Sequence, residues 1–378
     1  QLSGRPYLEQ EIDEHTADAG VITRMEAFWD STEKVKINSS ATPPFIRSVK
    51  EFRPDRILYL PPMTDHLHAF AAAFRAHGLE AKILPTSDEQ SLYLGRKYTK
   101  GKECLPAVLT TGDLLKAVQS ADFDPARAAF FMPAAGGPCR FGLYHQLHRL
   151  VLDEVGMGDV QVFSPNQGST LYHELGMVSK DFTKLAWKGV VAVDLLIKLL
   201  LETRPYAQDR QECQTLYANW LEQISRTVAE NEDLRPVVAQ AAKDFASLPR
   251  REDRSKPVVG IVGEIYVRSN PFANEYLVQR LEDLGLEAWL PTIGEWIHYV
   301  NHTGKRQAKR NRQFMAWFKL ELESMIQSRL ERSLLQAGNG WLRSLPEPEI
   351  RELLSAASPY LSPEFEGEAI LSIGKSVD

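Results

Sequence analysis

Two cysteines stand in settings where a thiol could do chemistry. Cys104 follows Gly101 and precedes Pro106, a residue suited to the first turn of a helix. Cys139 follows an apolar run at 128–132 and a string of Gly and Pro, and leads into a predicted helix. A thiolate at a helix N-terminus faces backbone N–H groups and the positive end of the helix dipole, which lowers the thiol pKa. Both thiols are therefore candidates for metal ligation or nucleophilic attack.

Other interpretations of the cysteines stay open on spacing alone. A free cysteine is commonly a small buried apolar side chain. The sequence has no Cys-x-x-Cys pair, so Cys104 and Cys139 form no local metal motif, and a disulfide or a nucleophile is also compatible with them. Cys213 lies in the polar stretch 209–214, which is typical of a helix surface. We therefore expect Cys213 to have no role in function.

The sequence around the cysteines alternates between predicted strands and helices. The predicted strands lie at 56–61, 81–85, 128–132 and 160–163, with a helix at 65–77 and another after Cys139. This alternation predicts a parallel, doubly wound sheet. Such sheets bind ligands in the loops at the C-terminal ends of their strands, so we expect both sulfurs at one edge of the sheet.

Length and pattern indicate two α/β domains joined by helices. The chain has 378 residues and a mass of 42.7 kDa, more than one ordinary hydrophobic core needs. We expect a first doubly wound, parallel-sheet domain over 1–182, a helical connection over 183–256 and a second such domain over 257–378. In the second domain we predict a strand at 258–267, a helix at 274–284, a strand at 288–290 and a long polar helix at 305–337.

Composition excludes several classes of protein. The net charge of −6 argues against a general nucleic-acid binder. No apolar run reaches the roughly 18 residues needed for a membrane span, and the low cysteine content fits a reducing cytoplasm. The string Gly374–Ser376 lacks the spacing of a P-loop, so we expect no ATP hydrolysis by this chain. The first residue is Gln rather than Met, so we expect that an N-terminal portion is missing, has been removed or belongs to a larger polypeptide.

Three further polar residues are candidates for contact with a ligand. Glu264 falls inside the predicted apolar strand, where an unpaired carboxylate would be costly. Its partner is expected to be Arg268 or backbone amides of the following loop, and a structural role and a ligand contact are both compatible with it. Asn274 is expected to cap the next helix or to lie near its start.

A basic run occupies the beginning of the predicted long helix. Its members are Lys305, Arg306, Lys309, Arg310 and Arg312. Cations at a helix N-terminus oppose the helix dipole, so this clustering calls for a compensating anion. The phosphate of a CoA-type ligand or an acidic partner surface would serve, and a solvated helix face is the alternative.

An acidic string near the N-terminus has two interpretations. Asp13, Glu14, His15 and Asp18 could converge on a metal ion. They also directly precede a helical pattern at 21–29, and acidic residues before a helix stabilise its N-terminus. Capping or domain docking and metal binding both remain open.

Five segments together resemble a known family. They are DEHTADAGVITRMEAF at 13–28, KECLPAVLTTGD at 102–113, GPCRFGLYHQ at 137–146, VGEIYVRSNPFANEYLVQRLEDLG at 262–285 and EW at 295–296. In combination they resemble the activase-related members of the 2-hydroxyacyl-CoA dehydratase iron-sulfur superfamily, over nearly the whole chain. The resemblance implies two doubly wound domains with a low-potential iron-sulfur cluster at their junction.

The resemblance also implies roles for particular residues. Cys104 and Cys139 match the first two cluster ligands of the family, and Cys213 matches none. Pro138 and Arg140 would shape and screen the loop of Cys139. The cluster would be 4Fe-4S or larger.

The third family ligand has no counterpart in this sequence. Relatives continue past a segment like 367–375 into a turn that carries a cysteine, whereas this sequence ends at Asp378. Three explanations stay open: the protein has lost this piece, the sequence is incomplete at its C-terminus, or the remaining ligands come from another chain. Two thiolates are too few for a four-thiolate cluster, and sharing across a homodimer, or with a related subunit, would complete it.

The resemblance predicts a cytoplasmic electron-transfer component of an ATP-driven, low-potential reductase or acyl-CoA dehydratase system, served by an ATP-hydrolysing activase partner. Two alternatives are a scaffold of the same fold that has lost its cluster and a catalytic dehydratase subunit with a CoA pocket.

Overall fold

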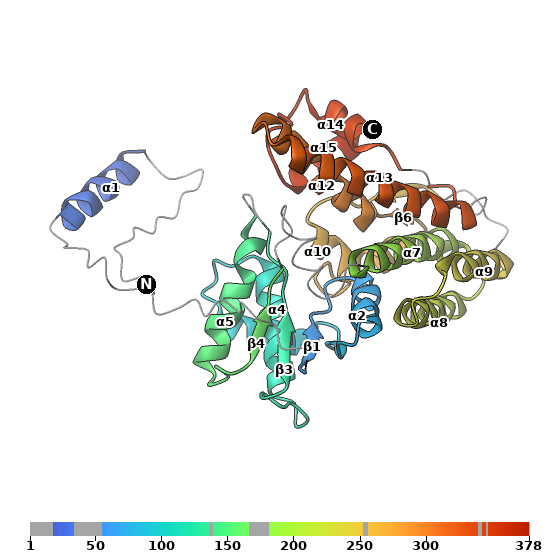
Figure 1. Ribbon diagram of the computed structural model, residues 1–378, viewed down its shortest axis with the longest axis horizontal. Helices are drawn as coiled ribbons and strands as arrows, with labels where there is room; N and C mark the ends of the chain where they lie inside the picture. Colours follow the sequence, from blue (N-terminus) through green and yellow to red (C-terminus); the bar gives the residue numbers. More distant parts are fainter. Residues whose placement is uncertain are drawn as a thin grey trace. The chain divides into compact units, whose positions relative to one another are not determined.

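The computed structural model describes residues 18–33, 55–135, 139–165, 181–251, 256–338, 342–344 and 347–377. The chain divides into two compact units, residues 1–50 and 51–378 (Figure 1). The first unit contains helix α1, Asp18–Glu33. Of the acidic string, only Asp18 falls in a described segment, at the start of α1. The interpretations of Asp13, Glu14 and His15, and that of Pro138, concern positions outside the described residues.

The second unit contains a four-stranded parallel sheet in the order β2-β1-β3-β4. Its strands are β1 (Ile57–Leu60), β2 (Ala81–Ile83), β3 (Ala128–Phe131) and β4 (Gln161–Phe163). Leu58 aligns with Ala81 on one side and with Ala129 on the other, and Phe130 aligns with Val162. The four strands predicted from the sequence are confirmed, each slightly shorter than its apolar run.

Helices cover both faces of this sheet (Figure 1). Alternate strand residues point to opposite faces, so Leu58 and Phe131 join one core while Phe130 joins another. The first core also contains residues of α2 (His66–Ala76) and α7 (Phe182–Thr203). The second contains residues of α3 (Glu89–Tyr98), α4 (Leu105–Val118) and α5 (Tyr144–Glu154). The sheet is therefore buried on both sides, as its apolar strands require.

Two glycines let α3 and α4 pack at very close range. A Cβ added to Gly112 of α4 would overlap the carbonyl oxygen of Ser91 in α3. A Cβ added to Gly95 of α3 would likewise overlap the carbonyl oxygen of Val108 in α4. The two backbones therefore touch where any larger residue would force them apart.

A helical stretch follows the sheet. After α7 come the 3₁₀ turn η2 (Arg204–Tyr206), α8 (Arg210–Ala229) and α9 (Leu234–Ser247). The expectation that Cys213 lies on a helix surface is wrong, because Cys213 is fully buried in the first core. It begins the apolar face of α8 that continues through Tyr217, Leu221 and Ile224. The polar residues of the first helical turn concealed that spacing.

A second parallel sheet has two strands, β5 (Val258–Gly260) and β6 (Glu287–Trp289). The predicted strand over 258–267 is wrong beyond its first residues. Gly263 has a φ of 126°, and Glu264 then caps helix α10 (Ile265–Ser269), so Glu264 is not a strand residue. Helix α11 (Leu277–Asp283) leads to β6. The chain is thus mixed α/β with parallel sheets, and the domain boundaries at 182 and 256 stay predictions.

The long helix predicted at 305–337 is two helices. Helix α12 (Ile293–Arg310) ends at Asn311, and α13 (Phe314–Ala337) begins after Arg312, whose φ is 56°. Lys309 and Arg310 therefore lie in the last turn of α12, where cations stabilise the helix dipole rather than oppose it, Lys305 and Arg306 precede them in the same helix, and Arg312 follows it. The premise that the run needs a compensating anion is wrong.

Helices α14 (Ile350–Ala357) and α15 (Glu368–Val377) end the described part of the chain. Within the described ranges, no helix is both long enough and apolar enough to cross a membrane.

Candidate functional site

The candidate site lies at the C-terminal edge of the four-stranded sheet. In the order β2-β1-β3-β4, the connection after β1 leads toward one edge of the sheet and the connection after β3 leads toward the other. Ligands of open α/β sheets bind where the direction reverses, which here is between the C-terminal ends of β1 and β3. Residues after β5 contact the loops at this edge. The Asn270 amide donates to the carbonyl of Pro62 at 3.1 Å, and the Tyr266 hydroxyl lies 3.3 Å from that of Ser87. The C-terminal ends of β1, β2 and β5 therefore meet here.

Cys104 occupies the N-cap of α4, as its Pro106 predicted. Its sulfur makes no capping hydrogen bond and lies 2.6 Å from the hydroxyl of Tyr144. Burial raises the pKa of Tyr144 far above its ordinary value, and the hydrogen bond to Cys104 raises it further. The phenol therefore keeps its proton, so Tyr144 is the donor whenever Cys104 is a thiolate.

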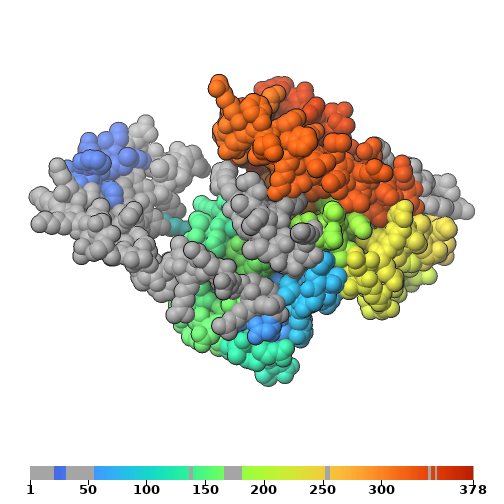
Figure 2. Space-filling model, viewed as in Figure 1, coloured from blue at the N-terminus to red at the C-terminus, as the bar shows by residue number. Residues whose placement is uncertain are grey.

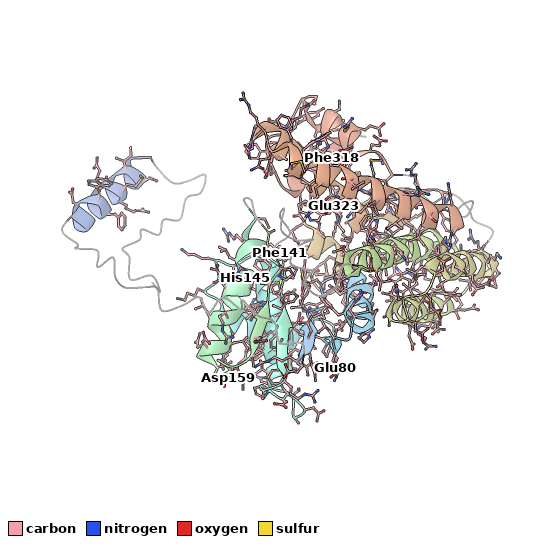
Figure 3. The ribbon with its side chains drawn as sticks, viewed as in Figure 1. Glu80, Phe141, His145, Asp159, Phe318 and Glu323 are labelled. Carbon is pink, nitrogen blue, oxygen red and sulfur yellow. The ribbon has the colours of Figure 1, made fainter. Side chains whose placement is uncertain are left out.

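Cys139 occupies the N-cap of the 3₁₀ helix η1 (Arg140–Leu143). Its sulfur accepts a long hydrogen bond of 3.5 Å from the backbone N–H of Phe141, a residue labelled in Figure 3. Partial desolvation raises the pKa of the Cys139 thiol, and the amide opposes this only in part. Negative charge on Glu368, Cys104 and Glu264 adds to the increase. The expectation of a lowered pKa is therefore wrong for Cys139.

The fold brings the two cysteine loops together. Ionisation of Cys104 affects the pKa of Cys139, and both sulfurs affect that of Tyr144, so the three groups share one electrostatic environment. The Arg140 guanidinium donates to the carbonyl of Lys102, two residues before Cys104. Arg140 thus ties the loop of Cys139 to the loop of Cys104.

Two carboxylates bind the first turn of α10 beside this cysteine pair. Glu264 accepts from the N–H of Val267 at 2.7 Å, and Glu368 of α15 accepts from the N–H of Ile265 at 2.9 Å. Burial raises the pKa of both carboxyls. A backbone amide is thus the partner of Glu264, one of the two kinds predicted. Glu368 was not predicted as a site residue, although it lies in the family-like segment 367–375, because only tertiary packing brings α15 to α10.

Arg268 and Asn274 have mainly structural contacts. Arg268 is buried, and its guanidinium donates to the carbonyl of Gly263 at 3.4 Å. Burial lowers its pKa, while the charges of Glu295 and Glu368 oppose that change. Asn274 donates to the carbonyl of Val267 at 3.0 Å and accepts from the N–H of Leu277 at 3.1 Å, so it lies near the start of α11, one of the two positions predicted.

A buried polar chain missed by the sequence analysis lies at the same edge. The Ser87 hydroxyl donates to a carboxylate oxygen of Asp113 at 2.8 Å and also lies next to the Tyr266 hydroxyl. Asp113 is 1% exposed, and burial raises the pKa of its carboxyl to about 6. An acidic residue within the apolar pattern of α4 was the available signal, by the reasoning applied to Glu264.

The basic run pairs with acidic groups of the chain itself. Lys305 lies 3.1 Å from Glu321 of α13, and Arg310 lies 2.9 Å from Glu364. Arg306 lies 3.6 Å from Glu364 and 3.7 Å from Glu366. Lys309 and Arg312 are exposed. These pairs link α12 to α13 and to the segment before α15.

The two thiols at this site are the right kind of ligand for an iron-sulfur cluster, but they are fewer than a cluster usually requires. Thiolates are the usual cluster ligands, and Cys104 and Cys139 are free thiols. In the part of the chain that the structure describes, no three His, Cys, Asp or Glu residues are grouped to hold a metal ion. The pair would thus supply half of a four-thiolate set.

No protein-family model, curated protein or solved structure matches this chain.

Tyr144→Phe is expected to slow alkylation of Cys104 by iodoacetamide about threefold to tenfold at pH 8. The reactive species is the thiolate, and a hydrogen bond to a charged acceptor contributes roughly 1.5 kcal/mol or more. The rate is measured by mass spectrometry of the peptide that contains Cys104. Tyr59→Phe is the control, because Tyr59 packs against Phe123 and Phe130. An unchanged rate in Tyr144→Phe would show that the 2.6 Å contact does not stabilise the thiolate.

Proposed function

We propose that this chain is an iron-sulfur electron-transfer protein in which Cys104 and Cys139 ligate the cluster. The observation that carries the proposal is the convergence of two free thiols at one sheet edge, linked through Tyr144 and Arg140. Both thiols precede helical segments, and the backbone N–H of Phe141 donates to the sulfur of Cys139. When bound, the cluster would supply one-electron transfer.

The charges around the pair support the low-potential class that the family resemblance implies. Glu264 and Glu368 interact with Cys139, and negative charge near a cluster disfavours the addition of an electron. Tyr144 acts in the opposite direction, because a hydrogen bond to a sulfur stabilises the reduced cluster. The balance of these groups would set the reduction potential.

The remaining ligands are proposed to come from a second chain. Two doubly wound domains meeting at the cysteines, in a cytoplasmic homodimer or a complex with a related subunit, would allow the cluster to be shared. An ATP-hydrolysing activase partner would then deliver the electrons. The acceptor would be a reductase or acyl-CoA dehydratase reaction, and a CoA-type ligand belongs to that proposal.

A scaffold protein without a cluster is the second candidate. It is favoured by the raised pKa of Cys139, which keeps that thiol protonated at neutral pH, and by the lack of a third grouped ligand in the described ranges. Metal ligation requires the thiolate, so cluster binding must supply the free energy needed to deprotonate Cys139.

Iron and acid-labile sulfide per chain distinguish the two candidates. After anaerobic reconstitution we expect about two or more irons per chain and an EPR signal after dithionite reduction. Cys104→Ala combined with Cys139→Ala should abolish iron binding. Cys213→Ala is the matched control and should retain it, since Cys213 lies in the core.

Iron retained by the double variant would overturn the ligand assignment. Absence of iron from the unaltered protein under the same conditions would favour the scaffold.

A further inference from the structure

A second group of polar side chains lies at the C-terminal end of β1 and has no role in the iron-sulfur proposal. The chain passes from β1 through a short connection at 61–65 into α2, and Thr64 and His66 lie at the end of that connection. Asp194 comes from α7. Helices α2, in blue, and α7, in yellow-green, lie side by side in Figure 1 and in Figure 2. The three side chains are therefore at the sheet edge where open α/β folds bind ligands.

The imidazole of His66 contacts the other two side chains through its two ring nitrogens. Nε2 lies 2.8 Å from Oδ1 of Asp194, and Nδ1 lies 3.3 Å from the hydroxyl oxygen of Thr64. An ionised carboxylate can only accept a hydrogen bond, so Nε2 carries the proton and Nδ1 is left as the acceptor for the Thr64 hydroxyl. This is the arrangement of nucleophile, base and orienting carboxylate in Ser-His-Asp hydrolases, with Thr in place of Ser.

Burial and further hydrogen bonds fix the base and its carboxylate. His66 is 5% exposed and Asp194 is 7% exposed. The Asp194 carboxylate also accepts from the N–H groups of Ile293 and Gly294 in the first turn of α12, at 2.8 and 2.9 Å. Thr64 is only half-buried, so its hydroxyl is the member of the three that a ligand can reach. The imidazole is therefore held in one orientation beside an accessible hydroxyl.

The backbone at Thr64 offers donors for the negative charge of a reacting carbonyl. Asp65 is the N-cap residue of α2, and its side chain makes no capping hydrogen bond. Among the described residues, no group accepts from the backbone N–H of Thr64 or of Asp65. The Asp65 carboxylate accepts instead from the hydroxyl of Tyr217 in α8 at 2.5 Å. In α/β hydrolases the nucleophile also stands between a strand and a helix, and the N–H of the next residue stabilises the oxyanion.

We propose that Thr64, His66 and Asp194 form a site that hydrolyses activated carboxylic esters. Oγ of Thr64 attacks the ester carbonyl carbon and passes its proton to Nδ1 of His66, while the carbonyl oxygen takes the negative charge beside the N–H of the next residue. The bond to the leaving alcohol breaks, and the alcohol receives that proton. Water then attacks the acyl group on Thr64 with His66 as base, which releases a carboxylic acid and restores the hydroxyl. The site contains neither Cys104 nor Cys139, so it does not depend on the iron-sulfur proposal.

Hydrolysis of p-nitrophenyl acetate by the full 378-residue chain tests the proposal. Cys104→Ala and Cys139→Ala are present throughout, so that neither thiol reacts with the ester. Thr64→Val removes only the hydroxyl and should lower kcat/KM at least about a hundredfold, whereas Thr64→Ser keeps a hydroxyl and should stay within about tenfold. Thr215→Val is the matched control, because Thr215 is an exposed residue of α8, and it should keep the full rate. Circular dichroism confirms that each variant is folded.

Asp194→Asn tests the positioning of the base. An amide group that donates to Nε2 of His66 makes that nitrogen the acceptor, so the ring proton moves to Nδ1 and the Thr64 hydroxyl loses its acceptor. We expect kcat to fall at least about a hundredfold. Proton-nitrogen NMR of the imidazole should show Nε2 protonated with Asp194 in place and Nδ1 protonated in the variant. A purely structural role of Asp194 would leave the protonated nitrogen unchanged in the folded protein.

A fluorophosphonate ester gives a second readout, because it bonds to an activated hydroxyl. Mass spectrometry should find its adduct on Thr64, and the adduct should be absent from Thr64→Val. Hydrolysis that survives Thr64→Val, an adduct at another residue, or hydrolysis no faster than in buffer with Thr64 intact would each overturn the proposal. A chain that hydrolyses the ester but binds no iron after reconstitution would contradict the iron-sulfur function and support this site.

Discussion

Arg204→Ala is expected to lower the free energy of unfolding by about 3–5 kcal/mol. The Arg204 guanidinium donates to both carboxylate oxygens of Glu282, at 2.8 and 2.9 Å, and the two side chains are only 7% and 2% exposed. Arg204 also donates to the side-chain carbonyl of Gln214. Removing the cation leaves a carboxylate buried without its counter-charge, which costs more than the ion pair itself contributes. Urea denaturation followed by circular dichroism measures the change.

Arg226→Ala is the matched control for that experiment. Arg226 pairs with Glu222 one helical turn away at 3.3 Å, and both side chains are more than half exposed. A surface pair of this kind contributes less than about 1 kcal/mol. Equal losses in the two variants would contradict the view that burial of Glu282 sets the cost.

Asp113→Asn is expected to raise the free energy of unfolding at pH 7 by about 2 kcal/mol. Burial raises the pKa of the folded carboxyl from 3.8 to about 6, so ionised Asp113 destabilises the fold. Below pH 3.8 both states are protonated and this cost is absent. As pH rises from there to about 6 the unfolded chain ionises first, and stability falls by up to about 3 kcal/mol. Asparagine keeps an acceptor for Ser87 and carries no charge.

Unfolding free energies at pH 4 and pH 7 test this expectation. The gain from Asp113→Asn should be small at the lower pH and large at the higher one. Asp88→Asn should behave in the opposite sense, because Lys116 and the backbone of Ser91 lower the pKa of Asp88. Replacing the Asp88 carboxylate should therefore lower the free energy of unfolding at pH 7. A stabilisation by Asp113→Asn that does not vary with pH would contradict the role given to ionisation.

The first sheet and the positions of both cysteines could be predicted from local sequence. Short apolar runs separated by turn residues define β1 to β4, and Pro106 marks the start of α4 after Cys104. Local signals failed at Gly263, where a turn was read as a continuing strand, and again where the backbone changed direction without Gly or Pro. Asn311, Arg312 and Gln313 separate α12 from α13 although none is a helix breaker, and that break reverses the meaning of the basic run.

The partners of the site residues could not be predicted, because they depend on tertiary packing. Tyr144 follows Cys139 by five positions, yet its hydroxyl binds Cys104. Glu368 reaches the first turn of α10 from α15, which is about 100 positions further along the sequence. The pKa of Cys139 reflects desolvation and three neighbouring negative groups, none of which its own loop reveals.

The contact between α3 and α4 fixes where a sulfur atom can be. With Gly112 against the backbone of Ser91, and Gly95 against that of Val108, α4 has no freedom to slide or rotate past α3. Cys104 is the N-cap of α4, so its position depends on the backbone contacts at Val108 and Gly112, about one and two helical turns away. A side chain at either glycine would push α4 away from α3. It would thereby move the Cys104 thiol away from Tyr144 without changing any residue that contacts the thiol.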